Sequence, residues 1–542
     1  MTVGIATAPA LRGPRAPAWR PGVNAAAAAA LAAIVVWLGP PGTDLAAHVF
    51  QRNLFLTHGF SLWTNYWYAG RYSFVGYSLI YYPLAALLGI KLLAVLSVAG
   101  ATAAFTVVAE RTWGSAAIWA ARCFAVAAAA SVLTAAFPYA LGLAFSLAAL
   151  IALSHSRPWI FAALVALTFA ASPLAFVLLV VVAAGIAASR SRRDIAKPAL
   201  GIAAVGTIAV LLWRLFPDEG RFPFSTIELL AALAFCGLGL ALTWRVERAR
   251  ILRSFFAVYA LACLAAYAVP SGLGENIARV RYAALPLAVL TLSLRRWRPL
   301  PWAIAAFALA LAWNATPLAY SFVRTSSDPS AAAAYWQPVI GFLHRDLGPA
   351  YRVEAVDTAG HWEAVYLAQA EIPIVRGWFR QDDFPHNELL YDKLGSRAYV
   401  AWLHRMGVRY VVLTDAPLDY SARTEAALLR SGHSGLHPVF RTSDVTVFAV
   451  PAPVPIVTGP AHPKVLSLGD SSIVLSLARP GTYRVAVNYS PYMSAPNACI
   501  RESPDGMIDL QAQRAGVLTL AFTVTASHAF AAFSGSRSSC PS

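Results

Sequence analysis

The chain has 542 residues, of which 58% are apolar and only 13% are charged. Soluble globular proteins carry about 25% charged residues, so this composition excludes an ordinary soluble enzyme, and it also excludes a disordered chain. A chain longer than about 300 residues normally divides into domains. The composition therefore predicts a polytopic membrane protein with further folded parts attached to it.

The net charge of +16 is confined to one part of the chain. Residues 1–324 contain 25 Lys and Arg against 8 Asp and Glu (+17), whereas residues 325–542 contain 17 against 18 (−1). A nucleic-acid surface needs its basic residues on one folded face. Here they lie between apolar stretches, where they fix membrane topology, so we exclude a nucleic-acid partner.

Eleven stretches are apolar enough to form membrane-crossing helices, which need about 17–25 mostly apolar residues. The pairs around Pro138 and Pro173 can each also be read as one broken helix. The predicted spans are residues 23–39, 90–109, 115–135, 139–153, 158–171, 173–189, 197–215, 226–243, 254–269, 282–294 and 299–320.

The basic residues predict the orientation of these spans. With a cytoplasmic N-terminus, 16 of the 25 basic residues before position 325 fall in cytoplasmic segments, as the positive-inside rule requires. An odd number of spans then places the C-terminal part outside. We expect a multi-pass protein of the cytoplasmic membrane whose first helix is retained and not cleaved. The cytoplasmic residues are Arg12, Arg15, Arg20, Arg111, Arg157, Arg190, Arg192, Arg193, Lys197, Arg245, Arg248, Arg250, Arg253, Arg295, Arg296 and Arg298.

Three domains are expected: a transmembrane domain over 1–324, an extracytoplasmic α/β domain over 325–450 and a β-sandwich-like domain over 451–542. The α/β prediction rests on alternating strand and helix patterns. These are a strand at 352–356, a helix at 389–406, a strand at 408–413, a helix near 421–430 and strands near 437–449. The sandwich prediction rests on short strand runs at 464–468, 472–478, 482–489, 516–524 and 528–533.

The five cysteines agree with this division. Cys123, Cys236 and Cys263 lie in predicted spans, where cysteine is a small buried apolar residue. Cys499 and Cys540 are the only pair in the exterior part, and an oxidising compartment favours a disulfide between them. No Cys/His cluster has zinc spacing, so no metal ligands are predicted.

The predicted exterior loop between the first two spans, residues 43–83, carries the most chemistry. Asp44 and His48 are four residues apart, so on a helix they share one face. A carboxylate at the membrane surface can act as a general base on a hydroxyl. The alternative is that Thr43 or Asp44 caps an interfacial helix and that the aromatic residues of the loop form an interfacial belt.

Arg279 and Arg281 lie in a second exterior cluster, although topology disfavours exterior arginines. Guanidinium groups bind phosphate in a bidentate manner, so one interpretation is a phosphate site at the membrane surface. The other is pairing with Glu275 or with the exterior domain. The sequence alone favours neither.

These features resemble the GT-C superfamily of membrane glycosyltransferases. The stretches Asp44-Leu-Ala-Ala-His48, Trp67-Tyr-Ala-Gly70 and Tyr81-Tyr82-Pro83-Leu84 are similar to bacterial GT-C-like membrane proteins of the YfhO-like and 6-pyruvoyl-tetrahydropterin-synthase-related group. Residues 376–382 and 407–412 also resemble that group. The resemblance implies a GT-C-like fold, with a lipid-linked sugar donor and therefore no nucleotide fold.

The resemblance also implies roles for these residues. Asp44 would deprotonate the acceptor hydroxyl, with inversion at the sugar, and His48 would orient Asp44 or contact the donor phosphate. Arg279 and Arg281, with Arg71, would hold that phosphate. Many relatives have a second acidic residue in a later exterior loop. Asp218, Glu219 and Glu275 match no firm pattern, so no cofactor is assigned and a divalent cation stays open.

Acceptor binding is expected at a polar and aromatic set, because carbohydrate surfaces often have that composition. Trp362, Glu363 and Asp383 belong to the same polar and aromatic motif. The alternative is a solvated loop with two core tryptophans. The sandwich is either a carbohydrate-binding module or merely a lid or partner surface. The expected acceptor residues are Trp67, Tyr68, Trp378, Arg380, Gln381 and Asp382.

The predicted function is transfer of a sugar, arabinofuranose or mannose, from polyprenyl phosphate to a cell-envelope glycan or glycolipid. A lipid-linked sugar flippase is the main alternative, but transport paths need ionisable residues inside the spans. Here such residues lie mostly at the span ends. A non-catalytic envelope-assembly scaffold is the third interpretation.

Overall fold

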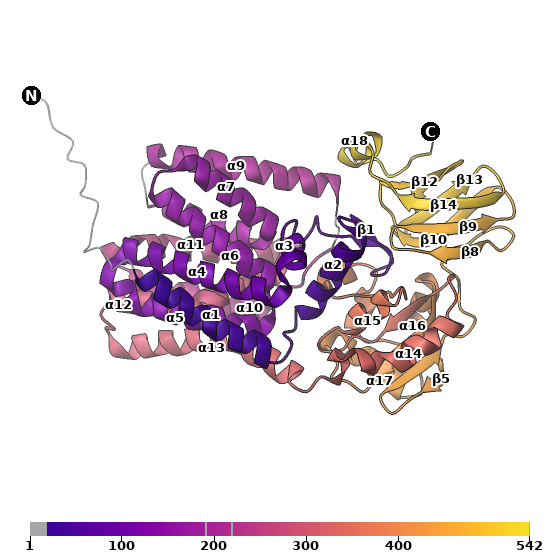
Figure 1. Ribbon diagram of the computed structural model, residues 1–542, viewed down its shortest axis with the longest axis horizontal. Helices are drawn as coiled ribbons and strands as arrows, with labels where there is room; N and C mark the ends of the chain where they lie inside the picture. The colour runs from indigo at the N-terminus through magenta and orange to yellow at the C-terminus, as the bar shows by residue number, and fades with distance from the viewer. Residues whose placement is uncertain (1–18, 190–191, 218–219, 541–542) are drawn as a thin grey trace, which may run out of the picture. The chain divides into compact units, whose positions relative to one another are not determined.

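The computed structural model describes residues 19–189, 192–217 and 220–540. The chain forms two compact units (Figure 1). The first, the helical unit, contains the described residues of the ranges 1–39, 88–207 and 223–320. The second, the mixed unit, contains those of the ranges 40–87, 208–222 and 321–542. The mixed unit is therefore assembled from three separate stretches of sequence.

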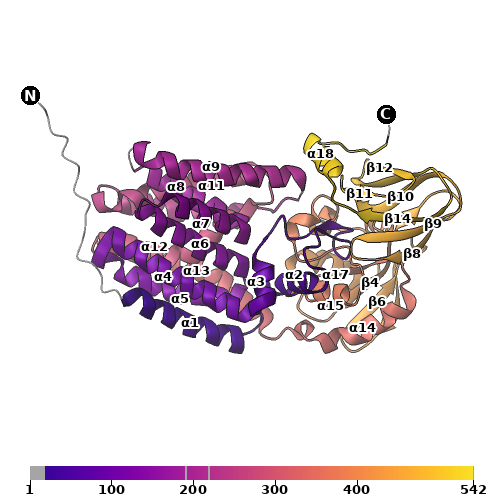
Figure 2. The ribbon, with the colours of Figure 1, turned by 45° about the horizontal axis from the view of Figure 1, so that its top comes forward.

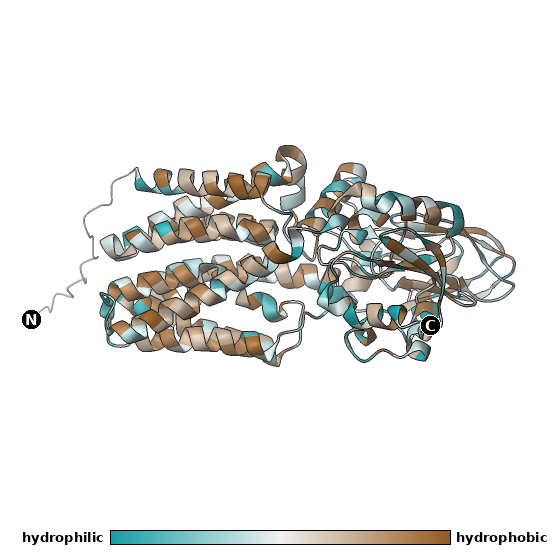
Figure 3. Cartoon of the chain, turned by 90° about the horizontal axis from the view of Figure 1, so that it is seen from below, coloured by the Kyte–Doolittle hydropathy of each residue, from teal (hydrophilic) through white to brown (hydrophobic). Residues whose placement is uncertain are grey.

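A helix coincides with each of the eleven predicted spans. Among the described residues, eight stretches are long and apolar enough to cross a membrane. Ile90–Thr134, which contains α4 and α5, counts as one of them, and α7 and α8 are shorter apolar helices. The protein is a polytopic membrane protein, and its helices are largely brown in Figure 3. The helices are α1 (Arg20–Leu38), α4 (Ile90–Trp113), α5 (Ile118–Ser131), α6 (Phe137–Ser154), α7 (Pro158–Ala171), α8 (Pro173–Ala187), α9 (Arg192–Leu215), α10 (Thr226–Thr243), α11 (Arg250–Ala268), α12 (Ala284–Leu294) and α13 (Leu300–Thr325).

Pro138 and Pro173 separate helices and do not break single ones. Each proline lies at the start of a helix, α6 or α8, where its missing N–H costs nothing. The Ser172 side chain accepts a hydrogen bond from the Ala175 N–H and so caps α8. Small residues allow the helices to pack closely. At Gly185 of α8, an added Cβ would lie 2.9 Å from the Phe255 backbone of α11.

The predicted α/β region forms one four-stranded sheet with the order β3-β4-β6-β5. β3 and β4 are parallel, and β4-β6 and β5-β6 are antiparallel. The predicted helix over 389–406 is too long, because residues 392–395 separate a short 3-10 turn from α16. The elements are α14 (Ala333–Asp346), β3 (Arg352–Ala355), α15 (Glu363–Gln369), α16 (Ser396–Arg405), β4 (Val408–Thr414), α17 (Arg423–Arg430), β5 (His437–Arg441) and β6 (Val445–Ala449).

Residues 457–522 form two four-stranded sheets, β12-β13-β10-β7 and β11-β14-β9-β8, in the yellow part of Figure 2. Their inward side chains build one core with the α/β sheet, including Ile473, Tyr483 and Leu510. The strands are β7 (Val457–Thr458), β8 (Lys464–Leu468), β9 (Ser472–Leu477), β10 (Gly481–Asn488), β11 (Met493–Ser494), β12 (Ala498–Glu502), β13 (Met507–Ala512) and β14 (Gly516–Phe522).

The predicted strand at 528–533 is wrong, because these residues lie in α18 (Ala526–Ser534). The Thr525 side chain accepts from the His528 N–H and caps the helix, and Gly535 ends it with φ +73°. Cys499 and Cys540 form a disulfide bond.

The predicted first exterior loop belongs to the mixed unit. It contains α2 (Leu45–His58), the two-stranded β1 (Trp63–Thr64) and β2 (Arg71–Tyr72), and α3 (Tyr81–Leu88). Asn488 Nδ2 donates to the carbonyls of Tyr68 and Gly70, and the Asn65 N–H donates to the Asp470 carbonyl. These bonds attach the loop to the sandwich.

Candidate functional site

Asp44 lies at the N-cap position of α2 and is 9% exposed. In the described part of the chain, no α2 backbone N–H donates to its carboxylate, so the side chain does not perform the capping role. Thr43 Oγ1 donates to Asp44 Oδ1 at 3.3 Å. The Thr43 backbone is held on both sides, since its carbonyl accepts from Trp378 Nε1 at 3.0 Å and its N–H donates to Ser321 Oγ at 3.3 Å.

His48 lies one helical turn after Asp44 and is completely buried. Its Nδ1 is 3.3 Å from the Tyr82 hydroxyl. The imidazole ring is also surrounded by the rings of Tyr77, Tyr81 and Tyr82, with centroids 5.5–6.1 Å away. The ring is therefore fixed in position by aromatic packing and by one hydroxyl.

The Tyr82 hydroxyl contacts His48 and lies within electrostatic range of Asp44 and Arg71. Burial raises the pKa of Tyr82 well above its ordinary value; Asp44 raises it further, whereas Arg71 lowers it. Tyr82 therefore stays protonated and can donate to His48 Nδ1, which leaves the proton of a neutral imidazole on Nε2. Asp44, His48 and Arg71 thus act on one phenol group.

Arg71 forms a buried ion pair. Its Nε is 2.5 Å from Asp382 Oδ2, and its guanidinium lies over the Phe379 ring at 4.1 Å. Arg71 Nη1 is buried and has no hydrogen-bond partner among the described residues. Arg71, expected at a donor phosphate, and Asp382, expected at an acceptor, are thus brought together and bind each other.

Trp67 and Tyr68 are core residues in this structure, with 0% and 3% of their surface exposed. Trp67 stacks on Phe50 at 3.9 Å and donates from Nε1 to the Ala364 carbonyl at 2.8 Å. A Cβ on Gly377 would lie 2.7 Å from the Trp67 ring and 2.8 Å from the Tyr68 ring. These two side chains hold the loop against residues 364–379 and present no exposed ring to an acceptor.

The other expected acceptor residues lie on one segment, at Trp378 and the 3-10 turn Arg380–Asp383, and are half-buried. Arg380 pairs with Asp419 at 2.9 Å and covers the Tyr420 ring at 4.1 Å. The Gln381 carbonyl accepts from the Arg221 N–H. Trp378 of this segment donates a hydrogen bond to the Thr43 carbonyl, so the segment borders Asp44.

Arg279 and Arg281 belong to the helical unit, in the 3-10 segment Gly274–Ala283. Arg281 pairs with Glu228 at 3.0 Å and with Glu275 at 3.9 Å. Arg279 Nε donates to Asn276 Oδ1 at 3.2 Å. The pairing that the sequence left open is therefore present for Arg281.

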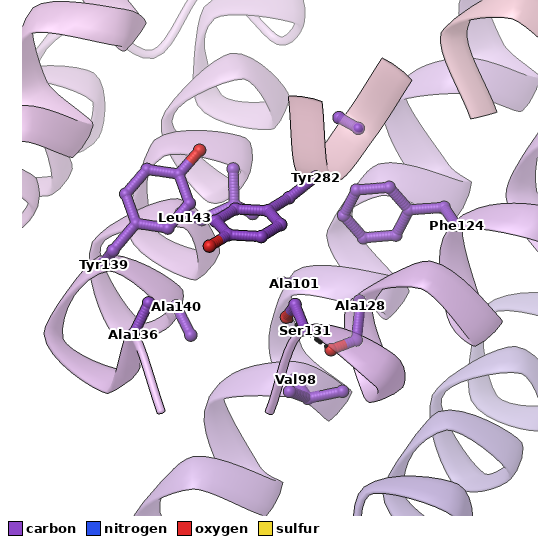
Figure 4. A pocket seen from close by; sticks show the side chains of 11 residues that line it. Val98, Ala101, Phe124, Ala128, Ser131, Ala136, Tyr139, Ala140, Leu143 and Tyr282 are labelled. Carbon is purple, nitrogen blue, oxygen red and sulfur yellow. Dashed lines mark hydrogen bonds between the residues drawn. The ribbon is translucent and has the colours of Figure 1, made fainter. Parts of the chain in front are cut away.

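A small apolar pocket lies next to this segment, between α4, α5, α6 and the residues that precede α12 (Figure 4). Tyr139 and Tyr282 line it, with ring centroids 6.4 Å apart, and Phe124 lies on another wall. Arg279 is close enough to Tyr139 to act on its hydroxyl electrostatically. The pocket combines an apolar lining with the hydroxyl groups of Ser131, Tyr139 and Tyr282 and a nearby cation.

Some predicted residues cannot be placed. Asp218 and Glu219 lie outside the described residues, as do Arg12, Arg15 and Arg190. Two features were missed from the sequence: the role of Tyr82 as the partner of His48, and a buried cluster of charges around Arg376. That cluster includes Asp357, His361 and Glu363, which are close enough together to hold a metal ion.

The fold and the site define a polytopic membrane protein with a mixed unit in which the nearly buried Asp44 lies one helical turn before a buried His48–Tyr82 contact. No protein-family model and no curated protein matches the chain. A solved structure of the arabinofuranosyltransferase AftD from mycobacteria is similar at a TM-score of 0.45 and 18% identity, over 81% of this chain and 40% of that one. A variant of that enzyme gives a TM-score of 0.45 and 17% identity over 81% and 42%. The chain thus spans about two fifths of the matched enzyme, and a likeness of this degree does not assign an activity.

Proposed function

We propose that the protein is a membrane glycosyltransferase of the GT-C type that uses a polyprenyl-phosphate sugar. The observation that carries this proposal is the position of Asp44: a nearly buried carboxylate at the start of α2 that does not cap the helix. A desolvated carboxylate with fixed polar neighbours suits general-base catalysis. The narrower YfhO-like assignment remains a prediction from short motifs.

In the proposed reaction Asp44 accepts the proton of the acceptor hydroxyl. The hydroxyl oxygen then bonds to the anomeric carbon while the bond from that carbon to the phosphate oxygen breaks, with inversion at the sugar. Polyprenyl phosphate leaves with the bonding electrons. His48, which contacts the Tyr82 hydroxyl, either orients the Asp44 carboxylate or contacts the donor phosphate. Its burial and its position one helical turn after Asp44 support this role.

Arg279 and Arg281 remain our proposal for the donor phosphate. Because Arg281 already pairs with Glu228 and Glu275, a phosphate would have to replace these carboxylates. The apolar pocket beside them suits part of an isoprenoid chain. Arg71 is a weaker phosphate ligand than the sequence suggested, because Asp382 already binds it.

Trp378, Arg380, Gln381 and Asp382 are proposed to border the acceptor, since Trp378 is bonded to the residue before Asp44. The acceptor would be an envelope glycan or glycolipid on the extracytoplasmic face, which the distribution of basic residues supports. Arabinofuranose and mannose are the sugars to test first. The boundaries at residues 324 and 450 remain our proposed domain division.

The test measures sugar transfer from a panel of polyprenyl-phosphate sugars by the purified protein and by Asp44→Asn. Loss of a general base should reduce turnover about 100-fold or more, while donor binding is kept. Asp392→Asn, at an exposed position, is the matched control and should retain full turnover. Full turnover by a folded Asp44→Asn would contradict the proposal, and the flippase and scaffold interpretations would then lead.

A further inference from the structure

A group of three potential metal ligands lies between β3 and α15. Asp357, His361 and Glu363 are 2%, 7% and 1% exposed, and each offers one ligand atom within 4.8 Å of the other two. His361 Nδ1 is 3.8 Å from Asp357 Oδ1 and 3.6 Å from Glu363 Oε1. All three come from seven consecutive residues of one turn in the mixed unit.

These separations are too long for hydrogen bonds but fit ligands that share an ion. Nitrogen and oxygen ligands lie about 2.0–2.2 Å from zinc, so two neighbouring ligands of one ion are about 3–4 Å apart. His361 Nδ1 is buried, points at the two carboxylates and has no hydrogen-bond partner among the described residues. A buried ring nitrogen without a partner is costly unless something else binds it.

The two carboxyl groups are already held by the protein. Asp357 Oδ2 is 2.5 Å from Arg376 Nη2, and Glu363 accepts from Thr358 at both oxygens, at Oε2 from the hydroxyl (2.7 Å) and at Oε1 from the backbone N–H (3.2 Å). His361 Nε2 is 4.0 Å from Asp419 Oδ2, which is too long for a hydrogen bond. Carboxylates fixed in this way are support that metal ligands usually have.

Acidic groups outnumber basic ones around the three residues. Six buried carboxyl groups gather near two arginines, Arg376 and Arg380, and oxygen ligands of this kind suit a divalent cation. The carboxylates are Glu354, Asp357, Glu363, Asp383, Asp419 and Glu425.

We propose that Asp357, His361 and Glu363 bind one divalent transition-metal ion of the zinc type, in a structural site separate from sugar transfer. One imidazole and two carboxylates suit Zn²⁺ better than Ca²⁺ or Mg²⁺, which prefer oxygen ligands alone. The ion would fix the turn that leads into α15. Because the Ala364 carbonyl accepts from Trp67, the ion would also stabilise the packing of residues 63–72.

The test uses the full chain in detergent with a tag that contains no histidine. After chelator treatment and desalting, the protein is incubated with Zn²⁺, Mn²⁺, Ca²⁺ or Mg²⁺ and desalted again. Bound metal is measured by mass spectrometry, and the midpoint of thermal unfolding by tryptophan fluorescence. We expect about one Zn²⁺ per chain and a higher midpoint with Zn²⁺ than with Ca²⁺ or Mg²⁺.

His361→Gln and the nearly isosteric Glu363→Gln should each lose the bound metal and the zinc-dependent rise in midpoint. His433→Gln, an exposed histidine outside the cluster, is the matched control and should keep both. Wild-type protein that retains less than about 0.1 Zn²⁺ or Mn²⁺ per chain would overturn the proposal. A folded His361→Gln or Glu363→Gln that binds as much metal as wild type would also overturn it. None of these readouts depends on the proposed glycosyltransferase activity.

Discussion

Arg71 Nε lies 2.5 Å from Asp382 Oδ2, and both side chains are less than one tenth exposed. The two residues are 311 positions apart, so this ion pair joins the predicted first exterior loop to the C-terminal part of the mixed unit. The Phe379 ring covers the guanidinium. A pair this well buried is costly to break from one side, because the remaining charge stays buried.

Arg71→Met should therefore destabilise the mixed unit by about 3–5 kcal/mol, and the double variant Arg71→Met/Asp382→Leu should recover much of that loss. Thermal unfolding of the two single variants and the double variant measures the coupling. The pair of Glu502 with Arg537, whose side chain is 70% exposed, gives a control, since Arg537→Met should cost at most about 1 kcal/mol. Equal effects of Arg71→Met and Arg537→Met would show that burial of the Arg71 pair does not matter.

Gly377→Ala should destabilise the same region by about 1–3 kcal/mol, because the added methyl would overlap the Trp67 and Tyr68 rings. The change should also alter the near-ultraviolet circular dichroism of these aromatic residues. Gly395→Ala places a methyl where no heavy atom lies within 4 Å and serves as the control. Equal midpoints of thermal unfolding for Gly377→Ala and Gly395→Ala would contradict the close approach of Gly377 to the two rings.

Glu425 predicts a specific pH dependence. Burial raises the pKa of its carboxyl from 4.5 to about 7, so the folded state binds a proton that the unfolded state has lost across that window. Its contribution to stability is present below pH 4.5 and is lost as the pH rises to 7, by up to about 3 kcal/mol.

Glu425→Gln should flatten the dependence of the unfolding midpoint on pH between about 5 and 8. The midpoint of the variant relative to that of wild type should rise toward the alkaline end of this range. The glutamine can still accept the hydrogen bond of the Tyr399 hydroxyl. Glu371→Gln, at an exposed position, should leave the slope unchanged. A Glu425→Gln profile parallel to that of wild type would contradict the raised pKa.

The disulfide between Cys499 and Cys540 closes a loop with a sequence separation of 41 residues. Replacement of both cysteines by serine should destabilise the sandwich by about 3–4 kcal/mol through the larger entropy of the unfolded chain. Reduction of the wild type with dithiothreitol should lower its midpoint to that of the double variant. The double variant itself should not respond to dithiothreitol, which is the internal control.

The helices of the helical unit were predictable because a long apolar run between basic loops is compatible with little besides a membrane-crossing helix. The run at 528–533 was misread, since a short apolar stretch is equally compatible with a strand and a helix. Thr525 before it and Gly535 after it were the helix boundary signals that could have decided this. In the same way, the helix predicted over 389–406 is interrupted: a 3-10 turn ends before Asp392, and α16 begins after Gly395.

The candidate site was predictable only where its residues are neighbours in sequence. The four-residue spacing of Asp44 and His48 placed both at the start of α2. The pairing of Arg71 with Asp382 depends on tertiary structure and has no local pattern. The spacing of Asp357, His361 and Glu363 resembles no familiar metal motif, so only the backbone turn around His361, where φ is +53°, brings the ligands together.

The attachment of residues 40–87 to the sandwich has a consequence for biosynthesis. Ser61 bonds to Asp470 across 409 residues, and Asn488 bonds to Tyr68 across 420. At about 5–20 residues per second, the ribosome needs roughly 20–80 s to make the intervening chain. During that time the aromatic loop emerges without the strands that will cover it.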